Sequence, residues 1–401
     1  MKHLVRAIAG FAVSSAAASV LPPTDPALRY IGRFDHSDPA APVFQWPLTA
    51  VEAAVTCASA GNATFQFETR DAKGRWRILV DGAVVDDSMH SAGEHSLSVA
   101  LPAASAGHTV RLLKDTEDVS GNPAMSLDGK PRAEGGVVFR GMRLGGGCRG
   151  ATGAAAARLL APAARTLEVY GDSISCGFGN QALTAKDKVL CLASACIEPL
   201  VKGDPGVLSR VSSASDAWHA QAARLVGAEV VGLQCISGIG MCKNANDLKD
   251  ASPWNMSAFA GATLPYQPGA PRWSFGGPAP DVVVVNLGTN DYDTSVFGNA
   301  PTEEAFEAQY VAFVGAAMAH YDRAATHVLL VCGPMTNRFC GSVSAVAETL
   351  LGLGYSAAYA AASLPESPAG NKGCAGHPDV DEDIAMAKLV VPVLKKLAGW
   401  E

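Results

Sequence analysis

The chain has 401 residues, of which 48% are hydrophobic and 17% are charged, and its formal net charge is −7. This length suits two ordinary domains, and the apolar fraction is large enough for buried cores and too large for a disordered chain. The acidic balance, without a basic stripe, argues against a nucleic-acid partner, because phosphate backbones require clustered lysine and arginine.

Residues 1–20 have the pattern of a secretory signal peptide. Lys2 and Arg6 precede an apolar, alanine-rich run that extends to about Val20, and small residues lie near its end. The run is too short and too weakly apolar to span a bilayer, so no membrane partner is expected. A frayed alanine-rich helix is the alternative. We therefore expect a secreted, extracellular protein.

The ten cysteines agree with export, because disulfides persist only in oxidising compartments. Four of them lie in loop-like stretches, and some pairing among them is expected: Cys191, Cys196, Cys340 and Cys374. The connectivity does not follow from the sequence. The spacing of the cysteines and histidines matches no zinc motif, so we expect neither a metal ion nor another cofactor.

Residues 27–149 are predicted to form many short strands. Phe65 and Phe67 alternate with polar residues, which is the period of a half-buried strand. Asp81-Gly82 is a strong tight-turn dipeptide between two strand-like runs. Short strands with turn signals and no helical period indicate an antiparallel all-β sandwich. The alanine-rich residues 150–164 follow three glycines and are expected to be a linker.

Strand and helix patterns alternate in residues 165–401. Residues 282–285 are four valines, apolar on both faces, as in a central parallel strand. Ser215 and Thr302 are placed to cap helices, and Pro378 is placed at the first position of a last helix. The alternation predicts a doubly wound α/β domain with a parallel sheet in a flavodoxin-like layout.

In such a sheet, the residues that bind and react with ligands lie beyond the carboxyl ends of the strands. Four polar blocks occupy such positions or precede the last helix: Gly171-Asp172-Ser173, residues 236–240 around Gly238, Gly288-Thr289-Asn290-Asp291, and His377-Pro378. A serine, a glycine backbone, an amide side chain and an imidazole are therefore expected to converge on one edge of the sheet.

Acyl transfer requires these four kinds of group. Ser173 needs an adjacent base, for which His377 is the candidate. The oxyanion needs preoriented donors, and the N–H groups of Ser173 and Gly238 and the amide of Asn290 supply three. Each block alone also fits a purely structural role, because such turns are common. Eight other histidines are alternatives to His377 as the base. Their coincidence at neighbouring strand ends favours catalysis.

The four blocks resemble those of SGNH hydrolases. The longer run from Gly171 to Asn180 is similar to carbohydrate esterase family two, the acetylxylan-esterase-like branch, and Tyr30–Asp35, Gln45–Pro47 and Lys114–Glu117 look like that family's sandwich. The resemblance implies a jelly-roll-like sandwich joined to an SGNH hydrolase domain. It also implies a carbohydrate O-acetyl esterase that acts on acetylated polysaccharides or oligosaccharides, such as xylan or glucomannan, through an acetyl-enzyme.

One position departs from the common SGNH pattern. Many members place an aspartate three residues before the histidine to orient the imidazole, and this chain has Cys374 there. The resemblance implies a Ser–His dyad, with a backbone carbonyl holding the ring of His377. Asp379 and Asp291 are the rival candidates for the orienting role.

Exposed aromatic rings beside the site are natural sugar contacts. Trp254 and Trp273 lie in the long irregular segment between the second and third strands of the α/β domain, with loop packing as the alternative for each. Trp218 is expected in the core. Rival functions are a short-chain acyl esterase or lipase, an acyltransferase, and a catalytically inactive carbohydrate-binding protein.

Overall fold

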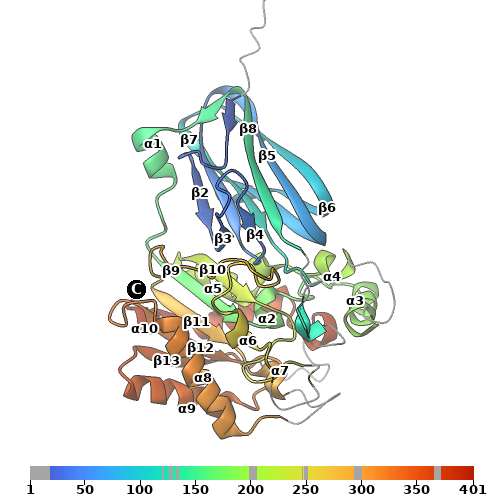
Figure 1. Ribbon diagram of the computed structural model, residues 1–401, viewed down its shortest axis with the longest axis vertical. Helices are drawn as coiled ribbons and strands as arrows, with labels where there is room; N and C mark the ends of the chain where they lie inside the picture. The colour runs from blue at the N-terminus through green and yellow to red at the C-terminus, as the bar shows by residue number, and fades with distance from the viewer. Residues whose placement is uncertain are drawn as a thin grey trace, which may run out of the picture.

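The computed structural model describes residues 19–119, 122–125, 130–131, 135–197, 206–245, 247, 252–292, 300–364 and 372–401. The predicted signal peptide, residues 1–20, lies outside these ranges except for its last two residues. A β-rich domain is stacked on an α/β domain (Figure 1), as the sequence predicts. These are called the β domain and the α/β domain below.

The β domain contains one antiparallel sheet of eight strands. The strands are β1 Ser19–Leu21, β2 Leu28–Ile31, β3 Phe34–Asp35, β4 Val43–Phe44, β5 Ala50–Val80, β6 Ala83–Leu101, β7 Ala104–Lys114 and β8 Val137–Gly150. The long strand β5 pairs with β2, β6, β7 and β8, so the sheet wraps in a barrel-like way around its core. Phe65, Phe67 and Trp76 are buried there. The jelly-roll layout stays a prediction.

A short helix, α1 (Gly153–Leu159), occupies part of the predicted linker, residues 150–164. It has no buried residue, so it adds little to either core. The three glycines before it belong to β8, where Gly145 and Gly146 pair with β5 close to the disulfide between Cys57 and Cys148.

The α/β domain is built on a parallel sheet, as predicted, and the sheet has five strands. Its strands are β9 Thr166–Gly171, β10 Glu229–Cys235, β11 Val282–Asn286, β12 His327–Cys332 and β13 Ala357–Ala361. The spatial order is β10-β9-β11-β12-β13, which is a flavodoxin-like order. The four valines of β11 are buried and lie between β9 and β12, which confirms the central strand.

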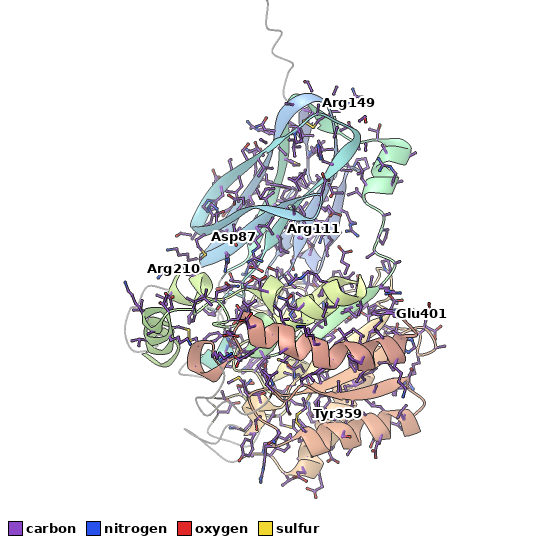
Figure 2. The ribbon with its side chains drawn as sticks, turned by 180° about the vertical axis from the view of Figure 1, so that it is seen from behind. Asp87, Arg111, Arg149, Arg210, Tyr359 and Glu401 are labelled. Atoms are coloured by element: carbon purple, nitrogen blue, oxygen red, sulfur yellow. A yellow bond between two sulfur atoms is a disulfide. The ribbon has the colours of Figure 1, made fainter. Side chains whose placement is uncertain are left out.

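Helices cover both faces of this sheet. The helices that the structure describes in this domain are α2 Ser173–Cys176, α3 Ala185–Ile197, α4 Gly206–Arg210, α5 Trp218–Val226, α6 Met256–Phe259, α7 Thr289–Tyr292, α8 Glu303–Met318, α9 Cys340–Gly352 and α10 Val380–Ala398. Three 3-10 turns add η1 Pro123–Met125, η2 Ala214–Asp216 and η3 Cys374–Gly376. Helices α8 and α9 pack on one face and α5 and α10 on the other, where α10 crosses in front of the sheet in Figure 2.

Two of the three predicted helix starts are wrong. Thr302 caps α8, because its hydroxyl accepts the Ala305 N–H. Ser215 does not cap α5: its hydroxyl binds Arg77 of the β domain, and the carboxylate of Asp383 accepts the N–H of Trp218 instead. Pro378 precedes the cap of α10, which is the following residue.

Charged side chains, some of them fully buried, join the two domains. Arg33 of the β domain donates to the Glu168 carboxylate at 2.9 Å and to the Ala260 carbonyl at 2.6 Å. Arg111, labelled near the junction in Figure 2, donates to Glu229 at the start of β10. Asp115 accepts hydrogen bonds from residues 213 and 215 of the α/β domain. The β domain therefore contacts strand β9, the start of strand β10 and the segment before helix α5.

Candidate active site

Ser173 lies where strand β9 meets helix α2, at the carboxyl edge of the sheet. Asp172 caps α2 by accepting the N–H of Ile174 at 3.0 Å. Gly171 is required by close packing, because a Cβ there would overlap the side chain of Ser175. The turn leaves the Ser173 side chain nearly buried, with 5% exposure, and directed toward one partner.

That partner is His377. Its Nε2 lies 2.7 Å from the Ser173 Oγ, and its Nδ1 lies 2.9 Å from the carbonyl oxygen of Cys374. Because a carbonyl only accepts, Nδ1 carries the proton, and Nε2 is free to accept the serine proton. The structure thus brings the two predicted catalytic side chains together, with a backbone carbonyl behind the ring.

Local geometry places the Cys374 carbonyl under the imidazole. The 3-10 turn η3 contains Ala375 with φ 51° and Gly376 with φ 77°, so the chain reverses between the carbonyl and the ring. A disulfide joins Cys374 to Cys191 of α3. Gly179, with φ +66°, approaches Cys374 so closely that any Cβ would collide with its side chain.

The histidine is buried in a site that disfavours its charged form. Burial lowers the pKa of His377 to about 4, and the hydrogen bond to the Cys374 carbonyl only partly opposes this. The imidazole is therefore neutral at neutral pH, which is the protonation state of a general base.

The two rival carboxylates are occupied elsewhere. Asp379 is the N-cap of α10 and accepts the N–H of Glu382 at 3.0 Å. Asp291 accepts three backbone N–H groups, those of residues 241, 242 and 243, at 2.8, 2.6 and 3.1 Å. Neither carboxylate is the hydrogen-bond partner of the His377 ring.

Asp291 instead shapes the Gly238 loop, residues 236–243. Its three hydrogen bonds fold this loop against α7, and Gly240 passes so close that a Cβ would meet the carboxylate at 2.7 Å. Burial raises the pKa of Asp291, and the three N–H donors oppose that rise. This role was not predicted from the sequence, although Asp291 is the last residue of the Gly-Thr-Asn-Asp block.

The predicted oxyanion donors lie on neighbouring segments. Gly238 has φ +79° and is partly exposed, so its backbone is open to a ligand. The Asn290 amide nitrogen donates to the Ile239 carbonyl at 2.7 Å and to the Asp172 carboxylate at 3.3 Å, so both of its N–H groups have acceptors in this structure. Burial raises the pKa of Asp172 to about 7. A disulfide from Cys176 to Cys235 ties α2 to the strand before the Gly238 loop.

The three tryptophans have different surroundings. Trp254 is 36% exposed, and its carbonyl accepts from Asn244, which also accepts the Gly240 N–H, so it lies beside the Gly238 loop. Trp218 is buried, as predicted.

The structure contradicts Trp273 as a contact beside Ser173. This ring lines a cavity of about 350 Å³ together with Thr166 and Glu229, the first residues of β9 and β10. Strand β9 spans about 20 Å from that edge to the serine. The cation–π contact with Arg33, at 5.7 Å, explains this position, because the arginine holds the ring at the domain junction.

Within the part of the chain that the structure describes, no group of three or more histidine, cysteine or carboxylate side chains is arranged to hold a metal ion. Among the same residues, no helix combines the length and apolar character needed to cross a membrane.

The four sequence blocks lie at one edge of a parallel sheet, and the predicted resemblance to carbohydrate esterase family two is confirmed by a family model and by solved structures of the same fold. Residues 30–127 match the family model for the carbohydrate esterase 2 N-terminal domain. The chain as a whole resembles family two carbohydrate esterases, which is the branch predicted from residues 171–180.

Two curated relatives carry esterase names. The chain is 28% identical over 321 residues to "Cellulase/esterase CelE" of Acetivibrio thermocellus, covering 78% of this chain and 31% of that protein. It is 25% identical over 238 residues to "Acetylxylan esterase / glucomannan deacetylase" of Cellvibrio japonicus, covering 59% of this chain and 58% of that one. The chain thus spans less than two thirds of the length of both relatives.

Solved structures share the fold over nearly the whole chain. A family two carbohydrate esterase from Clostridium thermocellum, in complex with cellohexaose, matches with a TM-score of 0.73 and 23% identity, covering 93% of this chain and 100% of that one. An acetyl xylan esterase from Butyrivibrio proteoclasticus matches with a TM-score of 0.71 and 18% identity, covering 96% and 100%. The two-domain arrangement is therefore common to these proteins.

Proposed function

We propose that the protein is a secreted carbohydrate O-acetyl esterase. The observation that carries this proposal is the hydrogen-bonded chain from the Ser173 hydroxyl through His377 to the Cys374 carbonyl. It supplies a nucleophile, a neutral base and a fixed acceptor behind the base, which are the parts required for acyl transfer.

The reaction has two halves. Ser173 Oγ attacks the acetyl carbon while His377 Nε2 takes its proton, and the oxyanion accepts from two of the predicted donors, Ser173 N–H and Gly238 N–H. The third predicted donor, the Asn290 amide, joins them when the bound ester displaces its longer hydrogen bond, the one to Asp172. The tetrahedral intermediate collapses, His377 returns the proton to the leaving sugar oxygen, and the acetyl group stays on the serine. Water then attacks the acetyl-enzyme with the same base, releasing acetate and restoring the hydroxyl.

The substrate class is inferred from three observations. One relative is named for activity on xylan and glucomannan, and one solved neighbour binds cellohexaose. Trp254 is 36% exposed, and Asn244 links its backbone carbonyl to the Gly238 loop, so its side chain is the candidate on which a sugar ring stacks. These observations favour an acetylated polysaccharide or oligosaccharide over a simple ester. The four disulfides agree with the proposed secretion.

A substrate panel tests the proposal. Acetate release is measured on acetylated xylan, acetylated glucomannan and acetylated monosaccharides, with nitrophenyl esters of increasing acyl length alongside. We expect acetate from a polysaccharide and a steep fall in rate beyond acetyl. A preference for long acyl chains would indicate the esterase or lipase alternative.

The same panel separates the remaining rivals. Acetyl transfer to an added sugar in place of acetate release would indicate an acyltransferase. Tight polysaccharide binding without hydrolysis of any ester would indicate an inactive carbohydrate-binding protein and would overturn the proposal.

A further inference from the structure

Ser237, the residue before the proposed oxyanion donor Gly238, is held entirely by the other domain. Its N–H donates to Glu117 at 2.9 Å, and its hydroxyl donates to the second oxygen of the same carboxylate. Its carbonyl accepts from the amide nitrogen of Asn122 at 2.7 Å. Both partners lie between β7 and β8, and all three side chains are buried.

The contact from Asn122 acts on the peptide group that carries the proposed donor. The Ser237 carbonyl and the Gly238 N–H belong to one planar, trans peptide, so they point in opposite directions. A donor fixed on the carbonyl therefore fixes the direction in which the N–H points. It also polarises the peptide, which strengthens the N–H as a donor.

The segment around Asn122 is itself fixed. The oxygen of its amide accepts the Ala124 N–H at 2.9 Å, which sets which end of the amide faces Ser237. The Ala124 methyl lies 3.0 Å from the place where a Cβ on Gly238 would stand. The 3-10 turn η1 thus packs against one side of the glycine and fixes the position of its backbone.

We propose that Asn122 of the β domain is a positioning residue of the oxyanion hole, which orients the Ser237–Gly238 peptide through its hydrogen bond to the Ser237 carbonyl. This inference rests on the proposed esterase function. It makes the β domain a structural part of the active site, in addition to any contact that this domain has with sugar.

Two substitutions test it in the full chain. Asn122→Asp keeps the shape and replaces the donor with an acceptor, whereas Asn122→Ala removes the donor without adding charge. Misplacing one oxyanion donor should lower kcat on nitrophenyl acetate roughly 10- to 100-fold and leave KM within about threefold. Affinity for a trifluoromethyl ketone, which forms an oxyanion on the serine, should fall in parallel with kcat.

Asp115→Asn is the matched control. Asp115 lies in the same interdomain segment and is buried, but it contacts residues 213 and 215 and not the Gly238 loop. We expect this variant to lower Tm and to keep kcat and ketone affinity within about threefold of wild type, when assayed well below its Tm.

The outcomes separate this inference from the function on which it rests. If wild type hydrolyses the ester and both Asn122 variants keep kcat and ketone affinity within twofold, the inference is wrong and the function stands. If Asp115→Asn loses kcat and ketone affinity as much as they do, domain docking and not peptide orientation is responsible, and the inference is again wrong. An inactive wild type would overturn both.

Discussion

The imidazole of His377 has a neutral acceptor behind it, where many serine hydrolases have a carboxylate. The Cys374 carbonyl fixes the tautomer and the ring plane at 2.9 Å, but it offers no full negative charge to stabilise the imidazolium. Burial adds to this effect, so the pKa of His377 falls to about 4. At the scale of the residue, the absence of a carboxylate partner should change how kcat/KM depends on pH.

The first prediction concerns the acid limb of the pH profile. His377 acts as a base only when neutral, and its pKa is lowered from 6.5 to about 4. Because the protonated form predominates below that pKa, kcat/KM on nitrophenyl acetate should be constant down to about pH 5 and fall tenfold per pH unit below about pH 4. A fall in kcat/KM that begins near pH 6.5, in a protein that is still folded, would contradict the lowered pKa of His377.

The second prediction concerns Asp379, the carboxylate nearest the histidine in sequence. Asparagine is an equally good helix cap, so Asp379→Asn should keep kcat/KM within about threefold and the pH profile unchanged. Steady-state kinetics and a thermal melt check both properties. A loss near 10⁴-fold would mean that Asp379 orients the imidazole, and the dyad would be wrong.

At the scale of elements, the turn η3 is held in place by the disulfide between Cys374 and Cys191 of α3. This bond closes a loop with a sequence separation of 183 residues, whereas the bond between Cys332 and Cys340 closes one of only 8. The longer loop should stabilise the fold more, because it restricts the unfolded chain more. It also fixes the carbonyl on which the histidine depends.

The third prediction compares the two disulfides. The double variant Cys191→Ser/Cys374→Ser should lose about 2–5 kcal/mol of unfolding free energy and at least about tenfold in kcat. The control, Cys332→Ser/Cys340→Ser, should lose less stability and keep kcat within about threefold. Denaturant titration and initial rates distinguish them. Equal effects on kcat would mean that the η3 disulfide does not position the histidine.

Much of the site was predictable at this scale because it follows local rules. The blocks around Ser173, Asn290 and His377 come directly after strands or before a helix, so chain order alone indicated that they converge. Contacts between distant segments were not predictable. The local pattern around Ser215 favours a helix cap, and that prediction is wrong because the hydroxyl binds Arg77, 138 residues away in sequence. Asn122 gave no signal, since its partner Ser237 lies 115 residues away.

At the scale of the whole molecule, ion pairs bind the β domain to the α/β domain, and the pair between Arg33 and Glu168 is hidden from water. The Arg33 side chain is 1% exposed, and it donates to Glu168 and to the carbonyls of residues 260 and 262. Glu168 lies in β9 five residues before the nucleophile, so this contact is about 16 Å along the strand from the site. It therefore contributes to docking and not to catalysis.

The fourth prediction follows from this separation. Arg33→Met leaves Glu168 buried without its cationic partner, which should cost about 3–5 kcal/mol and lower Tm, with kcat unchanged in assays well below Tm. The double variant Arg33→Met/Glu168→Gln should recover part of the loss, because it removes the uncompensated charge. A single variant with the stability of wild type would contradict the buried ion pair.

The most direct test of the central claim, that Ser173 carries the acyl group, is to locate the acetyl-enzyme. Wild type and Ser173→Ala are mixed with nitrophenyl acetate, quenched in acid within a turnover, digested and examined by mass spectrometry. The account predicts an acetyl group on the peptide that contains Ser173 in wild type, and neither that group nor appreciable turnover in the variant. An acetyl group on another residue, or a Ser173→Ala variant with the turnover of wild type, would contradict it.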